Sequence, residues 1–165
     1  MVNISGFGTS IRIVALQSFP VGLNISSLSD DQDSLIIEEV ESVGYQLTYD
    51  GGICIYDKAA VIRVSIAVIP NTEDDINLKL LLSARKGGFK WLPIQDVTSM
   101  LITYPDGGRV AFSNGTIISG PLGDSIEQSG RRKTNRYTFV FASYGGAQST
   151  SQIAKGVVQS ILGSI

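Results

Sequence analysis

The chain of 165 residues contains no histidine and a single cysteine, Cys54. Without histidine it cannot form the Ser-His or Cys-His pairs of nucleophilic enzymes, or a metal site with a histidine ligand. A lone cysteine cannot form a disulfide within the chain, so we expect a reducing compartment. Cys54 lies in an apolar stretch, GICIY, where a cysteine usually packs without reacting. These absences indicate a protein that is not an enzyme and holds no metal or cofactor.

Charged residues and long apolar runs are also scarce. Charged residues make up 17% of the chain, below the roughly 25% of ordinary soluble domains. No run approaches the ~20 apolar residues of a membrane-spanning helix, and the N-terminus lacks the pattern of a signal peptide. A polar turn over residues 26–34 contains Asp30, Asp31 and Asp33. It lacks the central glycine and the late glutamate of a calcium-binding loop. We therefore expect no membrane and no calcium partner.

What the chain does contain is the pattern of one β-rich domain. Residues 98–104 and 109–113 flank a Pro-Asp-Gly-Gly turn and predict a hairpin. Residues 116–119 extend the return strand past a kink at Asn114-Gly115. A polar, glycine-rich loop over residues 120–135 then leads to a strand over residues 137–141. Further strands are predicted at residues 10–17, 35–40, 43–49, 53–56 and 61–69, and Phe19-Pro20 is expected to end the first.

One helix is predicted over residues 71–86. Thr72 can cap it, acidic residues fill its first turn, and Leu78, Leu81 and Leu82 form its apolar stripe. Residues 143–150 resemble a flexible linker. Beyond them an amphipathic helix is predicted, with an apolar stripe that can dock on a partner, the interpretation we favour, or fold back on its own domain. The stripe consists of Ile153, Val157, Val158, Ile161 and Leu162.

These elements predict a mainly β fold: an antiparallel β-sandwich or barrel with one flanking α-helix, a long basic loop and a C-terminal amphipathic helix. The β domain is expected to span residues 1–142, and residues 143–165 form a linker and a helical extension.

Charge is unevenly distributed along the chain, although the net charge is only −2. Acidic residues predominate in residues 1–84 and basic residues in residues 85–165. The long loop carries a basic cluster, which we expect to contact the acidic turn of a neighbouring copy. This ring-stacking set consists of Asp30, Asp31, Asp33, Arg131, Arg132, Lys133 and Arg136. Pairing within one chain and a solvated loop are the alternatives.

Four stretches resemble tail-tube-type structural proteins of contractile-tailed bacteriophages. They are GFGTSIRIV, VIPNTEDDINLKLLL, VTSMLITYPDGGRVAFSNGTIISGP and GRRKTNRYTFVFA, and the resemblance covers residues 4–142. It implies a virion protein of the tail, made in the host cytoplasm. Its subunits would join in homohexameric rings that stack through long loops around a lumen for transient DNA cargo. A mildly acidic lumen would let DNA pass without sticking.

The resemblance also implies contacts with tail sheath or baseplate proteins. Proteins of this kind usually end soon after their last strand, whereas this chain continues. A tube-like adaptor at the baseplate end of the tube is therefore kept beside the repeated tube subunit. A stand-alone monomeric module, whose basic loop holds an acidic ligand, is the alternative from outside this class.

Overall fold

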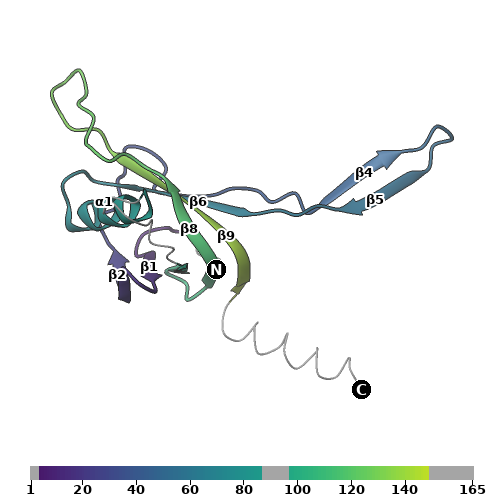
Figure 1. Cartoon of the computed structure of the whole chain (residues 1–165), viewed down its shortest axis with the longest axis horizontal. Helices are drawn as coiled ribbons and strands as arrows, with labels where there is room; N and C mark the ends of the chain where they lie inside the picture. The colour runs from purple at the N-terminus through teal and green to yellow at the C-terminus, as the bar shows by residue number, and fades with distance from the viewer. Residues whose placement is uncertain (1–3, 87–96, 149–165) are drawn as a thin grey trace.

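The computed structural model describes residues 4–86 and 97–148. One helix, α1 (Glu73–Lys86), accompanies nine strands in this part of the chain (Figure 1). The strands are β1 (Ser10–Ala15), β2 (Phe19–Ile25), β3 (Leu35–Ile37), β4 (Val43–Leu47), β5 (Ile53–Asp57), β6 (Ile62–Val68), β7 (Thr98–Thr103), β8 (Arg109–Ser119) and β9 (Asn135–Gln148). The predicted mainly β fold with one flanking helix is confirmed.

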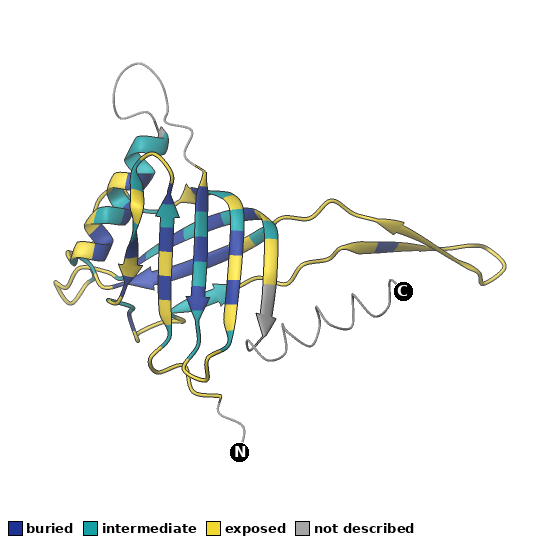
Figure 2. Cartoon of the chain, turned by 90° about the horizontal axis from the view of Figure 1, so that it is seen from below, coloured by how far each residue is buried: buried dark blue, intermediate teal, exposed yellow. Residues whose placement is uncertain are grey.

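Seven of these strands form one antiparallel sheet in the order β2-β1-β7-β8-β9-β6-β3. The sheet curls on itself into a half-barrel, so that its two ends face each other across a common core (Figure 2). The short strand β3 and the strand β2 are its free edges. The remaining strands, β4 and β5, pair only with each other and extend away from the sheet (Figure 1).

The predicted hairpin of β7 and β8 lies at the centre of the sheet. Its register changes between Thr98 and Met100, beside Asn114, whose φ of 54° lies in the left-handed region. The kink predicted at Asn114-Gly115 is therefore a bulge. Gly115 has to be a glycine, because an added Cβ would lie 2.3 Å from the carbonyl oxygen of Val140 on β9. The backbones of β8 and β9, which are paired neighbours in the sheet, therefore approach closely at this point.

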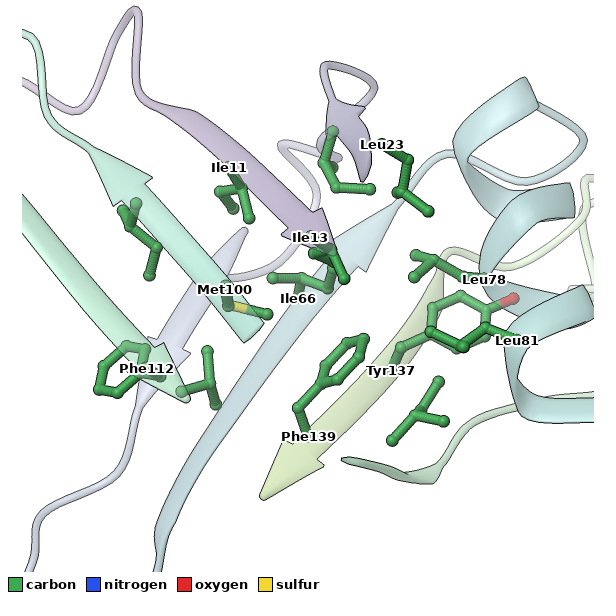
Figure 3. Packing of buried hydrophobic residues seen from close by; sticks show 14 of the residues in the cluster. Ile11, Ile13, Leu23, Ile66, Leu78, Leu81, Met100, Phe112, Tyr137 and Phe139 are labelled. Atoms are coloured by element: carbon green, nitrogen blue, oxygen red, sulfur yellow. The ribbon is translucent and has the colours of Figure 1, made fainter. Parts of the chain in front are cut away.

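Alternate residues of the strands point into the half-barrel and form the core. Figure 3 shows Ile13, Ile66 and Tyr137 converging with Leu78 and Leu81 of α1. All five side chains are at most 1% exposed. Burying each aliphatic side chain stabilises the fold by about 1.5–3 kcal/mol, so the helix is held to the sheet by its predicted leucine stripe. Leu82, the third leucine, is only partly buried.

The start of α1 follows the predicted capping pattern. The Asp75 backbone N–H donates to Thr72 Oγ1 at 3.4 Å, and Asp75 Oδ2 accepts from the Asn71 backbone N–H at 3.1 Å. Asp74 Oδ2 accepts from the backbone N–H groups of Ser26 and Ser27, at 2.8 and 2.9 Å. The acidic first turn therefore also attaches the segment after β2 to the helix.

Two features differ from the expectation. Residues 19–25 form the edge strand β2, although Phe19-Pro20 was expected to end the first strand. Proline is tolerated there because an edge strand has one side free of ladder hydrogen bonds. In addition, β9 continues to Gln148, over residues expected to begin the linker, because they pair with the start of β8.

Candidate interaction surfaces

The hairpin of β4 and β5, here called the arm, extends from the half-barrel (Figures 1 and 2). Directly opposed residues of an antiparallel pair share a face, and Tyr45 opposes Ile55 while Leu47 opposes Ile53. One face of the arm therefore consists almost entirely of large apolar side chains. With Val43 these five side chains are between 47% and 68% exposed. No core lies beneath them within the described residues.

The opposite face of the arm is less apolar, with the ring of Tyr56 as its one aromatic side chain. Gln46 opposes Cys54, and Gly44 opposes Tyr56. A Cβ on Gly44 would lie 2.4 Å from the Tyr56 ring, so the glycine lets this ring lie across the strand. Cys54 is exposed, so the expectation that it packs in an apolar interior is wrong. Its strand is apolar because of the neighbouring Ile53 and Ile55, whose face has no packing partner among residues 4–86 and 97–148.

The residues predicted for ring stacking lie together at one end of the half-barrel. Arg131 Nη2 forms an ion pair with Asp31 Oδ2, and the Thr134 hydroxyl also donates to Asp31. Arg136 donates to Gln32 Oε1 and to the backbone carbonyl of Asp33. The acidic turn and the basic loop are therefore joined within one chain. Hydrogen bonds from Ser29 and Thr134, together with Arg131, hold the pKa of Asp31 below its usual range.

The long loop between β8 and β9 is also attached to α1. Asp124 accepts from Lys79 Nζ, from Asn135 Nδ2 at 2.8 Å and from Arg132 Nη1 at 3.2 Å. The hydrogen bonds from Lys79 and Asn135 lower the pKa of Asp124. Two backbone hydrogen bonds close the tip of the loop, from the Glu127 N–H to the Arg131 carbonyl at 2.7 Å and from the Gly130 N–H to the Glu127 carbonyl at 2.9 Å. The loop thus holds a defined shape on the body of the protein. At Lys133 it is the backbone N–H that forms a contact, by donating to the carbonyl of Ser125.

Beneath this loop lies a buried polar cluster centred on Asp75, which is fully buried. Its carboxylate accepts from Asn135 Nδ2 at 2.8 Å, Tyr137 Oη at 2.7 Å and Lys79 Nζ at 2.9 Å. Burial alone would raise the pKa of Asp75, but the hydrogen bonds from Asn135, Lys79 and Tyr137 outweigh it, and the pKa is lowered. Burial and the same carboxylate raise the pKa of Tyr137 well above its usual range. The side-chain donors of Lys79, Asn135 and Tyr137 therefore join α1 to β9, where the long loop ends, at one carboxylate.

The apolar stripe predicted for the C-terminal helix lies outside the described residues, so Ile153, Val157, Val158, Ile161 and Leu162 stay a prediction. Within residues 4–86 and 97–148, no group of three potential acidic or cysteine ligands could hold a metal ion. No helix in that same part of the chain has the length and apolar character needed to cross a membrane.

Comparison with known proteins places the chain in a family. A family model described as tail fiber protein gp32 matches residues 2–145. The chain belongs to this family. No curated protein matches the gp32-family chain significantly.

Two solved structures resemble the gp32-family fold. A sheath/tube terminator of the PVC extracellular contractile injection system is 10% identical, with a TM-score of 0.53 over 88% of this chain and 96% of that one. A chain of the anti-feeding prophage baseplate is 10% identical, with a TM-score of 0.52 over 88% of this chain and 95% of that one. At this identity the likeness concerns the fold, and at that level the resemblance to tail-tube-type proteins is confirmed.

The arm is the surface that sequence reasoning did not identify. The alternation of VGYQL and ICIYD, with a Gly-Gly turn between them, correctly predicted the hairpin. The same alternation is typical of a strand with one face on a core. Only the structure shows that this apolar face is directed away from the core of its own chain.

Proposed function

We propose that the protein is a structural component of a contractile phage tail, which assembles into homohexameric rings of the tail tube and performs no catalysis. The observation that supports this proposal is the arm, an exposed hairpin with one apolar face. An isolated two-stranded hairpin is at best marginally stable in water. The arm therefore gains its stability from another chain, and in a ring each copy both gives an arm and receives one.

The size of the apolar face fits a closed ring better than a dimer of two arms. Removing its five half-exposed to two-thirds-exposed side chains from water is worth about 1–2 kcal/mol each, roughly 5–10 kcal/mol in all. That gain is similar to the ~4–15 kcal/mol that association costs in lost freedom. One arm contact alone is thus weak. A closed ring adds contacts for every chain without a further loss of freedom for the last closure.

The sheet provides a second kind of contact. Strands β2 and β3 are free edges of the half-barrel, and free edges pair readily with strands of another chain. Joining β2 of one copy to β3 of the next would make a continuous wall around a lumen, through which DNA passes. Such a wall leaves the outer surface of each ring to the tail sheath or to baseplate proteins. The assembled protein would belong to the virion tail.

The strands themselves would not make that lumen acidic. The seven strands of the large sheet contain four arginines, Arg12, Arg63, Arg109 and Arg136, and no aspartate or glutamate. A mildly acidic lumen would therefore take its carboxylates from loops, such as the turn at Asp30, Asp31 and Asp33. The ring-stacking role of that turn and of the basic loop is part of the proposal.

A terminal ring at one end of the tube is the second candidate. Both solved structures described above come from such places, a tube terminator and a baseplate. A terminal ring would stop after one layer, whereas a tube subunit stacks repeatedly. The stand-alone module that binds an acidic ligand is less favoured, because a monomer would leave the apolar face of the arm exposed to water.

Charges placed on the two faces of the arm test the proposal. The double variant Leu47→Asp/Ile55→Asp adds two carboxylates to the apolar face, and Gln46→Asp/Cys54→Asp adds two to the opposite face. Light scattering should show that wild-type assemblies are lost in the first variant and retained in the second. Circular dichroism should show an unchanged fold in both. Equal assembly of the two variants would contradict the role of the apolar face.

A further inference from the structure

The outer face of the large sheet is apolar where β8, β9 and β6 lie side by side. On β9 the buried rings of Phe139 and Phe141 alternate with Val140 and Ala142, so the latter two belong to the outer face. An antiparallel sheet with one face in water usually carries polar residues on that face. Apolar residues at these outer positions are therefore typical of a surface that another element covers.

An open groove of about 560 Å³, here called the outer groove, lies on this part of the sheet. It crosses four strands, because Thr98, Gly115, Phe141 and Ile62 are paired neighbours on β7, β8, β9 and β6, and residues of the groove lie at or beside each of them. Every residue that lines the outer groove is exposed or half-buried, so the groove does not belong to the core. Its apolar lining includes Val61, Val97, Val140 and Ala142, and Arg85 is its one charged side chain.

The apolar face of the arm has the length of this groove. Adjacent strands lie about 4.8 Å apart, so the distance from β7 to β6 across the groove is about 14 Å. The arm face runs along β4 from Val43 to Leu47, four steps of about 3.4 Å, which is also about 14 Å (Figure 1). An arm that lay across the four strands would therefore cover the groove with its five apolar side chains.

The charges of the arm and of the outer groove are opposite in sign. Residues 41–58 carry three acidic side chains and one basic side chain, so the arm is negatively charged. Arg85 lines the groove, Arg63 directly opposes Val140 at its wall, and no acidic side chain is part of its described lining. Opposite potentials steer two surfaces together and fix their orientation. The arm of another copy thus matches the groove in length, in apolar character and in charge.

We propose that the arm of one copy lies in the outer groove of the next copy, across its β7, β8, β9 and β6. This inference rests on the proposed assembly through the arm and names the surface that receives it. The chain returns from the arm through Val61, so each arm leaves its own chain beside the groove that receives a neighbour's arm. Arm and groove are different surfaces, so the contact runs head to tail and can repeat around a ring.

A charge placed in the groove tests this site in the full-length protein. Ala142→Asp adds a carboxylate to the groove, and Ala111→Asp adds the same group at an exposed outer-face position of β8 outside it. Light scattering should show that the concentration needed for assembly rises about tenfold or more in Ala142→Asp, because an unpaired carboxylate would be buried under the arm. It should stay at the wild-type value in Ala111→Asp, and circular dichroism should show an unchanged fold in both variants. Equal assembly of the two variants would overturn the groove as the receiving surface.

Disulfide formation between chains identifies the contact directly. In a Cys54→Ser background, a chain with Tyr45→Cys or Ile55→Cys on the arm is co-expressed with a chain of different mass that carries Ala142→Cys. Oxidation should give the mixed dimer with at least one arm cysteine, and none when Ala111→Cys replaces Ala142→Cys. A disulfide between two arms, or no mixed dimer in protein that still assembles, would overturn this site and leave assembly through the arm standing. A wild-type protein that stayed monomeric would contradict the proposed function itself, and this proposal with it.

Discussion

Replacing Asp75 by alanine should destabilise the protein more than any other single change in its acidic residues. The carboxylate is fully buried and accepts four hydrogen bonds, from the backbone of Asn71 and the side chains of Lys79, Asn135 and Tyr137. After the change, Lys79 and Asn135 keep Asp124 as a partner. The Tyr137 hydroxyl keeps only a long contact of 3.5 Å to a backbone carbonyl.

The magnitude follows from these partners. Hydrogen bonds to a charged group contribute about 1.5–3 kcal/mol each, and the two from Asn135 and Tyr137 are in a buried site. Removing one partner of a buried ionic network costs about 3–5 kcal/mol. The two bonds together give about 3–6 kcal/mol and the network argument about 3–5 kcal/mol, so we expect a loss of about 3–5 kcal/mol. At roughly 2–4 °C per kcal/mol for a chain of this size, the melting temperature should fall by about 6–20 °C.

Chemical denaturation with urea, followed by circular dichroism, measures this loss directly. Glu73→Ala is the matched control, because it removes the same charge from the same helix turn at an exposed position. It should cost less than about 1 kcal/mol, the value of a charge near a helix N-terminus. If the free energies of unfolding of Asp75→Ala and of the control differed by less than about 1 kcal/mol, the cluster would not hold the loop and the helix as described.

Two further results are expected. Gly115→Ala should lower the free energy of unfolding by about 1–3 kcal/mol or more, because the added Cβ meets the Val140 carbonyl. Gly123→Ala is the control: its Cβ would lie in open space, so the same urea titration should show almost no change. The pKa values of Asp75 and Asp124 are lowered in the folded protein, so the two ionised carboxylates stabilise the fold above pH 3.8, and this stabilisation is lost as the pH falls through the folded pKa values. The urea concentration at the unfolding midpoint should therefore fall in an acid series. In Asp75→Asn this fall should be smaller.

Much of the fold was predictable because local signals were strong. The Pro-Asp-Gly-Gly and Asp-Gly-Gly turns specify two hairpins, and the capped helix follows from Thr72 and its acidic first turn. The strand β2 was missed because Pro20 was interpreted as a terminator. The distinction between an edge strand and the end of a strand depends on the neighbouring strand, which the sequence does not reveal.

The surfaces were harder to predict than the elements. Alternating apolar residues in the arm look the same whether a core or another chain covers them, and Cys54 was misplaced for this reason. The charges of the two loops were recognised, but their pairing within one chain depends on the curl of the sheet. That curl brings Arg131 to Asp31, one hundred residues earlier. The Asp75 cluster escaped notice because capping explained the aspartate without its buried partners.

Negative-stain microscopy of the purified full-length protein, combined with its mass from light scattering, tests the central claim most directly. The proposal predicts rings of six-fold symmetry, which stack into tubes for a tube subunit and remain single for a terminal ring. A protein that remained monomeric at high concentration, with its arm exposed, would contradict assembly through the arm.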